Sequence, residues 1–273
     1  MKKYMNQDKS PLPDPADDVV AYNREAWDAQ VRKRNQWTMP VTPADVELAR
    51  TGEIKIVMTP EKHVPQEWFP DFRSKQVEVL CLAGSGGQQA PLLAAAGANV
   101  TVFDLSPEQL AQDQLVAERE GLELKTVQGD MQDLSVFAES QFDLIIHPCS
   151  NCFVPDVNVV WREAARVLKS GGEIISGFTK PIFYLFDYQE MEKGNLKVAH
   201  KIPYSDLTSI PAEETQTYID QGEPLCFGHS LTDQIGGQIA AGLMVNGYYE
   251  DVWEDYVISK YTTSYAVTKA MKQ

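Results

Sequence analysis

The segment Val79-Leu80-Cys81-Leu82-Ala83-Gly84-Ser85-Gly86-Gly87 predicts a short apolar strand that ends in a cluster of glycines. A helix-like segment, Gln88–Ala96, follows at once, and Gly97 stands where a helix would end. Glycines allow the backbone to approach a ligand closely, and the first turn of a helix offers free N–H groups. The segment therefore predicts a turn between a strand and a helix that could hold a ligand.

The same alternation of strand and helix continues outward from this turn. Ser106-Pro107-Glu108-Gln109 predicts a helix start, with Ser106 as N-cap and Gln109 closing a capping box, and this helix runs to Gly121. Asp156 is the expected cap of a further helix, which Ser170-Gly171-Gly172 ends. Short apolar runs predict the strands, namely Val77–Leu82, Val100–Phe103, Leu124–Val127, Phe142–Ile146 and Glu173–Phe178. This order predicts an α/β fold with a parallel sheet covered on both faces.

Polar residues follow several of these strands, and parallel strands bring their carboxyl ends to one edge of the sheet. Asp104, at the end of the second strand and 20 residues beyond Gly84, could accept hydrogen bonds from both ribose hydroxyls of an adenosine. Asp130 follows Gly129 at the end of the third strand and could accept from the adenine amine, with Met131 against the ring. Together these positions predict a nucleoside site at this edge.

These motifs resemble those of the class I S-adenosylmethionine-dependent methyltransferases. The matching residues are Val79–Gly87, Val102-Phe103-Asp104, Gly129-Asp130-Met131, Phe142–Ile146 and Arg166–Gly172, within a match over residues 76–180. Cys81–Gln89 also resembles an uncharacterised bacterial branch with a Gln-Gln pair after the glycines. The resemblance implies a Rossmann-like, doubly wound, mostly parallel seven-stranded sheet with an antiparallel C-terminal hairpin. Gly247–Tyr256 and Tyr261–Lys269 are the expected hairpin strands, after a helix-like Leu231–Val245.

The resemblance implies S-adenosylmethionine as cofactor, S-adenosylhomocysteine as product, a small-molecule acceptor and no metal. The residues expected to bind the cofactor are Ala83, Gly84, Ser85, Gly87, Gln88, Asp104, Leu105, Asp130, Met131, His147 and Asn151. This chain departs from the family at Cys81, where the first strand usually carries an acid that helps hold the cofactor's ammonium group. Ser85, Gln88, Gln89 or a carbonyl at the sheet edge would then take over that role.

His147 follows the fourth strand and is the candidate catalytic residue. Methyl transfer from a sulfonium is an in-line displacement that depends chiefly on positioning, and a general base is needed only when the nucleophile arrives protonated. His147 could be that base, or it could be a neutral hydrogen-bond partner of the cofactor or the backbone. Asn151, in the same loop, is a candidate contact of substrate or cofactor.

Cys149-Ser150-Asn151-Cys152 contains a C-x-x-C pair, which could be redox-active or half of a metal site. The chain has no second pair of this kind. We therefore expect two small residues of an active-site loop here, and no structural zinc.

The remaining segments predict an N-terminal helical extension over residues 1–75 and a methyltransferase domain over residues 76–273, with an insertion at about 180–230. Roughly the first dozen residues predict a poorly ordered tail. A helix is expected around Tyr22–Trp37, where Tyr22, Trp27 and Trp37 either pack on the core or form a lid over the cofactor. Ile182–Phe186 opens the insertion and predicts aromatic lining of a pocket for a small, partly apolar acceptor.

Composition narrows the possible partners. The 273 residues include 24 Lys and Arg against 39 Asp and Glu, which gives a net charge of −15, and no Lys or Arg occurs between Lys201 and Lys260. A nucleic acid or an anionic membrane is therefore disfavoured as a partner. No segment predicts a membrane span or a secretory signal, and four cysteines predict no disulfide framework, so a cytoplasmic location is expected. The oligomeric state stays open.

Two alternatives remain. A NAD-dependent oxidoreductase also uses glycines and a strand-end acid, but its G-x-G-x-x-G pattern would need a glycine where Gln89 stands. A non-catalytic protein that binds S-adenosylmethionine is favoured by the missing acid at Cys81.

Overall fold

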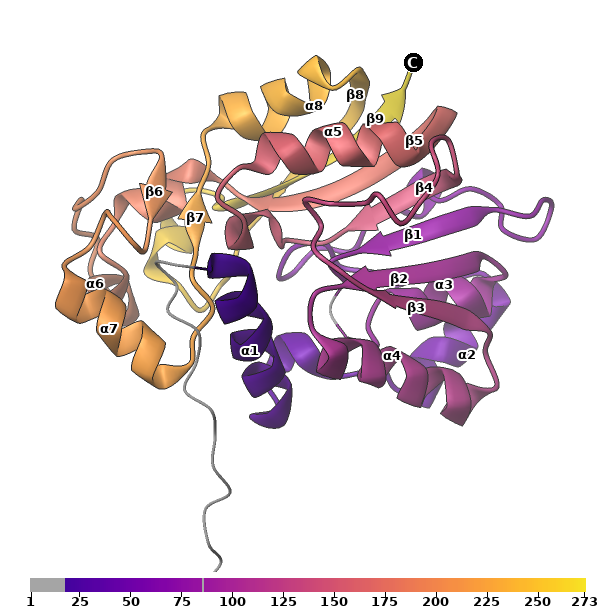
Figure 1. Cartoon of the computed structure of the whole chain (residues 1–273), viewed down its shortest axis with the longest axis horizontal. Helices are drawn as coiled ribbons and strands as arrows, with labels where there is room; N and C mark the ends of the chain where they lie inside the picture. Colours follow the sequence, from indigo (N-terminus) through magenta and orange to yellow (C-terminus); the bar gives the residue numbers. More distant parts are fainter. Residues whose placement is uncertain (1–17, 85) are drawn as a thin grey trace, which may run out of the picture.

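The computed structural model describes residues 18–84 and 86–273, so the predicted N-terminal tail and Ser85 lie outside the described residues. A seven-stranded sheet forms the centre, in the order β3-β2-β1-β4-β5-β9-β8 (Figure 1). Neighbouring strands are parallel from β3 to β5, and β9 is antiparallel to both β5 and β8. The predicted Rossmann-like sheet with an antiparallel C-terminal hairpin is thus confirmed.

The strands of this sheet are β1 (Glu78–Leu82), β2 (Asn99–Asp104), β3 (Leu124–Gln128), β4 (Phe142–His147), β5 (Leu168–Thr179), β8 (Leu243–Asp251) and β9 (Tyr265–Lys272). The α-helices are α1 (Val19–Arg32), α2 (Pro43–Thr51), α3 (Ala90–Ala96), α4 (Pro107–Glu120), α5 (Val157–Val167), α6 (Tyr188–Glu192), α7 (Ala212–Gln221) and α8 (Gly237–Ala240). Two short strands, β6 (Tyr204–Ser205) and β7 (Phe227–Gly228), pair apart from the main sheet.

Helices cover both faces of the sheet, with α2, α3 and α4 on one side and α5 and α8 on the other (Figure 1). In β1, Val79 and Cys81 belong to the core on the α3 side, and Leu80 and Leu82 belong to the core on the α5 side. Successive side chains of a strand point to opposite faces. A strand that is buried on both faces therefore needs apolar residues at consecutive positions, as β1 has.

The N-terminal residues join the sheet's own core. Ile54, Ile56 and Met58 are buried in the same cluster as Val79 and Cys81. The helix expected around Tyr22–Trp37 is α1, which ends at Arg32 and is followed by a 3₁₀ turn at Gln36–Thr38. The division into residues 1–75 and 76–273 stays a prediction.

Three local expectations need correction. Ser106 caps α4, but the Gln109 side chain accepts from the Gly86 amide and so does not close a capping box. Ser170-Gly171-Gly172 lies inside β5, because α5 already ends at Val167. The helix expected over Leu231–Val245 is a π-helix at Thr232–Gly236 followed by α8, and from Leu243 the chain is already strand β8.

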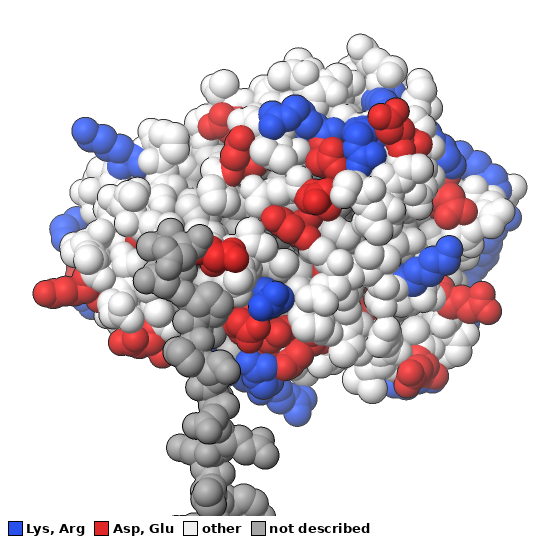
Figure 2. Space-filling model, in the orientation of Figure 1, with Lys and Arg blue, Asp and Glu red and all other residues white. Residues whose placement is uncertain are grey.

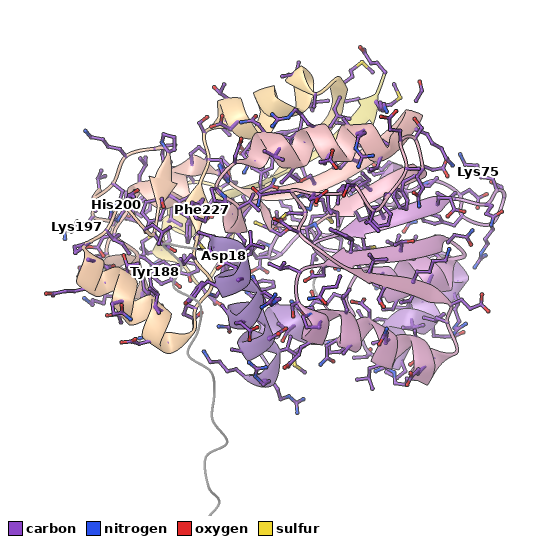
Figure 3. The ribbon with its side chains drawn as sticks, in the orientation of Figure 1. Asp18, Lys75, Tyr188, Lys197, His200 and Phe227 are labelled. Atoms are coloured by element: carbon purple, nitrogen blue, oxygen red, sulfur yellow. The ribbon has the colours of Figure 1, made fainter. Side chains whose placement is uncertain are left out.

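The insertion projects beyond the carboxyl ends of the parallel strands and contains α6, β6, α7 and β7 (Figure 1). Figure 3 shows Tyr188, His200 and Phe227 in this region, and Lys75 at the far end of the molecule, just before β1. On the face shown in Figure 2, acidic and basic side chains are interspersed. Within the described part of the chain, no helix is both long and apolar enough to span a membrane.

Candidate active site

A cavity of about 440 Å³ lies at the carboxyl edge of the sheet. The predicted cofactor residues that line it are Ala83, Gly84, Gln88, Asp104, Leu105, Asp130 and Met131. Gly87, His147 and Asn151 are not part of its wall, and Ser85 is not among the described residues. The structure thus brings the ends of β1, β2 and β3 together around one space, as the topology predicts.

The glycine turn is held from behind by α4. The Gly86 amide donates to Gln109 Oε1 at 2.9 Å, and the Gly87 amide donates to the Asp113 carboxyl. A Cβ at Gly86 would lie 2.8 Å from the Gln109 carbonyl oxygen, and Gly87 has φ +75°, so both positions favour glycine. Burial raises the pKa of Asp113 well above its usual range. The turn therefore depends on α4 as much as on its own sequence.

Asp104 ends β2 in the cavity wall with 9% of its surface exposed. Its Oδ1 accepts from the Ser106 amide at 2.9 Å, and none of the ion pairs between described residues involves it. Desolvation, together with the nearby Asp28 carboxyl, raises the pKa of Asp104 to about 7. A buried carboxyl without a cation beside a cavity is suited to accept hydrogen bonds from ligand hydroxyls.

The end of β3 supplies the neighbouring wall. Asp130 accepts from the backbone and side-chain nitrogens of Gln132, both at 3.0 Å, which fixes the carboxylate. A Cβ at Gly129 would overlap the Phe103 ring, so the backbone passes this ring only as glycine. Met131 is buried and packs with Phe103 in the core on the α5 side.

His147 is fully buried below the cavity wall. Its Nδ1 lies 2.8 Å from the Leu82 carbonyl oxygen and its Nε2 lies 2.7 Å from Asn151 Oδ1. Desolvation lowers the pKa of His147, so the ring is neutral at neutral pH and donates to only one of these two oxygens. Asn151 is itself held by Gln234, through Nδ2 to Oε1 at 3.0 Å. A base must reach its substrate, and both nitrogens of this buried ring face protein oxygens, so the geometry favours the alternative in which His147 bonds to the backbone.

Helix α1 crosses beside the mouth of the cavity. Its Asn23 donates to the carbonyl oxygens of Phe153 and Leu225 and accepts from the Leu225 amide. Trp27 lines the cavity and packs edge-on against Phe153 at 5.0 Å between ring centroids. Trp37 also lines the cavity, whereas Tyr22 is buried against Ala26 and Leu225. Two of the three predicted N-terminal aromatics thus face the cavity.

The loop after β4 and the insertion complete the wall. Cys149 and Cys152 are free thiols that line the cavity together with Cys226. The contact with Cys152, together with burial, raises the pKa of Cys149. The contact with Cys149 lowers the pKa of Cys152, but the contact with Cys226 and burial outweigh it and raise that pKa, so both groups are neutral thiols. No group of three or more potential metal ligands was found among residues 18–84 and 86–273.

Sequence reasoning missed several wall residues. Asp206 and Tyr204 come from β6 and its flank, Trp253 and Tyr256 come from the segment between β8 and β9, and Tyr265 is the first residue of β9. The available signal was the concentration of tyrosines after residue 180, where nine of the chain's eleven occur. Their convergence depends on how the insertion folds back on the sheet, which no local pattern specifies.

Comparison with known proteins identifies the family. Residues 80–176 match a family model described as a methyltransferase domain. An uncharacterised methyltransferase of Bacillus subtilis, YbaJ, is 49% identical over 254 residues, which cover 93% of this chain and 98% of that protein.

Solved structures show the same fold at lower identity. S-adenosylmethionine-dependent methyltransferases from Methanosarcina mazei and Mesorhizobium loti each superpose with a TM-score of 0.55 and 16% identity, covering 76% of this chain and 95% of theirs. With the near full-length relative, these matches show that the chain belongs to the class I S-adenosylmethionine-dependent methyltransferases.

Proposed function

We propose that the protein transfers a methyl group from S-adenosylmethionine to a small-molecule acceptor bound in the 440 Å³ cavity. The observation that carries this proposal is Asp104, a buried carboxyl without a cationic partner among the described residues, next to the glycine turn in the cavity wall. Membership of the family leaves the oxidoreductase alternative without support.

The residues present fit the cofactor. Asp104 would accept from the ribose hydroxyls, Asp130 would accept from the adenine amine, and the glycine turn would admit the rest of the molecule at close range. S-adenosylmethionine supplies an electrophilic methyl group on a sulfonium. Gln88 and Gln89 both line the cavity and are candidates for its ammonium group, because Cys81 is buried in the core and carries no charge. The Gln88 Nε2 already donates to the carbonyls of Gln36 and Met39, which leaves its oxygen as the acceptor.

The contribution of this chain to the reaction would be positioning and exclusion of water. Residues of helix α1 and of the insertion line the cavity, so an acceptor would be held in a wall that is rich in aromatic side chains. Such positioning can lower the barrier of an in-line displacement by roughly 7–11 kcal/mol. The lid role of the N-terminal segment is part of this proposal.

The test is titration of S-adenosylhomocysteine into the wild type and Asp104→Ala by isothermal titration calorimetry. Hydrogen bonds to a charged group contribute about 1.5–3 kcal/mol, so Asp104→Ala is expected to weaken binding roughly 10- to 100-fold. Glu139→Ala removes an exposed carboxylate outside the cavity wall and serves as the control. Equal affinity for Asp104→Ala and the wild type would contradict the proposed cofactor site.

A non-catalytic binding protein is the second candidate, favoured by the absence of an acid at Cys81. Radiolabel transfer from S-adenosylmethionine into fractionated small molecules of a lysate separates the two. Tight binding of S-adenosylhomocysteine without label in any fraction would favour the second candidate.

A further inference from the structure

Nine of the fourteen cavity-lining residues after Thr179 are aromatic, and they come from the insertion, from the segment between β8 and β9 and from the start of β9. We call the part of the cavity that these nine rings line the aromatic end, and the rings are Phe183, Tyr184, Phe186, Tyr188, Tyr204, Tyr218, Trp253, Tyr256 and Tyr265. It is separate along the sequence from the glycine turn and from the ends of β2 and β3. None of the proposed cofactor residues belongs to this end, so its chemistry should report on the acceptor rather than on the cofactor.

The rings of the aromatic end support one another. Phe183 packs edge-on against Tyr184 and Tyr256, with centroids 5.6 Å and 5.4 Å away. Tyr184 stacks on Tyr204 at 5.3 Å, and a Cβ at Gly228 would lie 2.6 Å from the Tyr184 ring. The faces of these rings are thus fixed before any ligand arrives, and a fixed aromatic face attracts cations.

The charge of the cavity wall has one sign. Its described residues include four carboxyl groups, those of Asp104, Asp130, Asp206 and Glu223, and no Lys, Arg or His. Asp206 belongs to the aromatic end and is 6% exposed. It accepts from the Tyr204 hydroxyl at 2.7 Å and from the Cys226 amide at 2.6 Å, and no ion pair between described residues involves it.

The other polar groups of this end carry no charge. Burial raises the pKa of Tyr184 and Tyr204, so their hydroxyls stay protonated at neutral pH. Burial also raises the pKa of Asp206, and it outweighs the Tyr204 hydroxyl, the Cys226 amide and nearby His200, which act in the opposite direction. An organic cation would stabilise the charged form of Asp206 further, whereas an anion would face a desolvated carboxyl with no basic group among the described wall residues.

We propose that the aromatic end selects an organic amine with an apolar or aromatic body and that it rejects carboxylates and phosphates. The amine is recognised as the ammonium between Asp206 and the ring faces, and since an ammonium nitrogen has no lone pair, the methyl group goes to another atom of the molecule. This inference rests on the proposed methyltransferase function, because it concerns the acceptor of that same site. It restricts the acceptor from any small molecule to molecules that carry a positively charged amine.

The experiment compares three probes of similar size and different charge, which are phenethylamine, phenethyl alcohol and hydrocinnamate. Each is titrated calorimetrically at neutral pH into the protein saturated with S-adenosylhomocysteine. The amine is expected to bind roughly tenfold tighter than the alcohol, and the carboxylate is expected to bind more weakly than both. Hydrocinnamate binding as tightly as the amine, or no binding of the amine at millimolar concentration, would overturn the inference.

Asp206→Asn provides a matched variant that keeps the shape of the side chain and removes its charge. The variant is expected to lose the preference for amine over alcohol while its affinity for S-adenosylhomocysteine stays unchanged, because Asp206 is not among the proposed cofactor residues. A preference that survives in a variant that still binds S-adenosylhomocysteine would contradict the role of Asp206. If Asp206→Asn does not fold, the comparison of the three probes on the wild type still tests the proposal.

The two proposals fail differently. Failure of S-adenosylhomocysteine to bind the wild type would refute the proposed function. Binding of S-adenosylhomocysteine together with a preference for the anionic probe would refute the acceptor class alone.

Discussion

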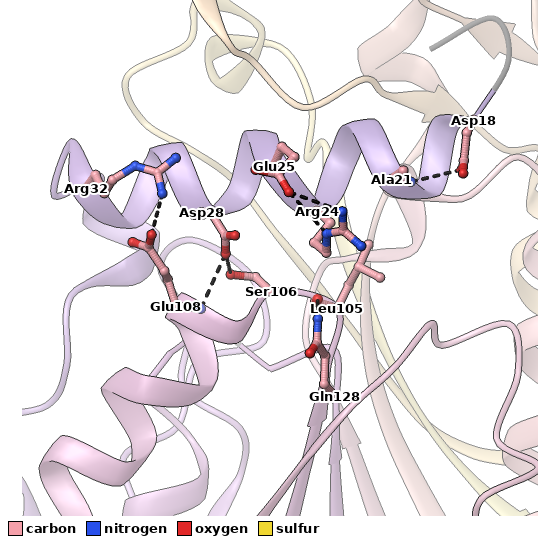
Figure 4. A network of polar contacts seen from close by, with 10 residues as sticks. All are labelled: Asp18, Ala21, Arg24, Glu25, Asp28, Arg32, Leu105, Ser106, Glu108 and Gln128. Carbon is pink, nitrogen blue, oxygen red and sulfur yellow. Dashed lines mark hydrogen bonds and ion pairs between the residues drawn. The ribbon is translucent and has the colours of Figure 1, made fainter. Parts of the chain in front are cut away.

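Asp28, on helix α1, accepts a hydrogen bond from the hydroxyl of Ser106, the residue that caps α4 two positions after Asp104 (Figure 4). The same Asp28 oxygen lies 3.3 Å from the Glu108 amide, in the first turn of α4. The N-terminal segment thus reinforces the helix start that follows the proposed ribose-binding acid. It also places a second carboxyl close enough to raise the pKa of Asp104.

Asp28→Ala is expected to lower the free energy of unfolding by about 1–3 kcal/mol, because it removes a buried acceptor from the Ser106 hydroxyl and the Glu108 amide. Asp28→Asn keeps an acceptor oxygen and should lose less. Urea unfolding of both variants measures the difference. Equal stability of Asp28→Ala and the wild type would mean that α1 contributes nothing to the start of α4.

The raised pKa of Asp104 predicts a pH dependence of stability. The folded-state pKa of about 7 exceeds the ordinary value of 3.8, so between these values the folded protein binds more protons than the unfolded chain. Stability contributed by this group is therefore highest below about pH 4 and is lost as the pH rises toward 7. Three pKa units correspond to roughly 4 kcal/mol as an upper limit.

Asp104→Asn removes the titrating carboxyl, so the variant should not lose this stability as the pH rises from 4 to 7. Compared with the wild type, the variant is expected to gain stability at pH 8 and to gain nothing at pH 4, as measured by urea unfolding at both values. Affinity of the wild type for S-adenosylhomocysteine should fall by up to about tenfold per pH unit below 7, since the ionised carboxylate is the better acceptor. A flat difference between the two proteins from pH 4 to 8 would show that Asp104 is not desolvated.

Gly129→Ala tests the close passage of the β3 end over Phe103. The new Cβ would overlap the ring, and overpacking of this kind typically costs about 1–3 kcal/mol. We expect lower stability and weaker S-adenosylhomocysteine binding, because Asp130 and Met131 would shift with the backbone. Gly236→Ala is the matched control, since its Cβ would meet only Thr232 at 3.7 Å. A variant Gly129→Ala that behaves like Gly236→Ala would contradict the packing.

The structural features that could be predicted from the sequence are those that depend on the chemistry of a few neighbouring residues. Ser106 and Asp156 cap helices as expected, because a short polar side chain before an apolar helical period satisfies free amides in any context. The strand-end acids converge because parallel topology leaves them no other edge. The prediction that Gln109 closes the Ser106 capping box was wrong, because the Gln109 side chain accepts instead from the Gly86 amide, 23 residues earlier in the chain.

The parts that sequence could not give depend on tertiary packing. A polar residue at a strand end can face the cavity, as Asp104 does, or turn into the protein, as His147 does toward the Leu82 carbonyl. The pattern of residues is the same in both cases. Likewise, Tyr204 and Tyr256 meet at one cavity only because the insertion and the β8–β9 connection fold toward each other.

His147→Asn distinguishes a positioning residue from a general base. If His147 holds the loop after β4 through Leu82 and Asn151, its replacement should reduce stability by about 1–3 kcal/mol and weaken S-adenosylhomocysteine binding. The rate at saturating cofactor, with an acceptor found by label transfer, should then change by less than about tenfold. Loss of a base would instead lower that rate by roughly 10²–10⁴-fold with cofactor affinity intact.

His63→Asn, at an exposed histidine, controls for the substitution itself. We expect the first pattern, because the ring is fully buried and both of its nitrogens face protein oxygens, so a substrate proton cannot reach either one.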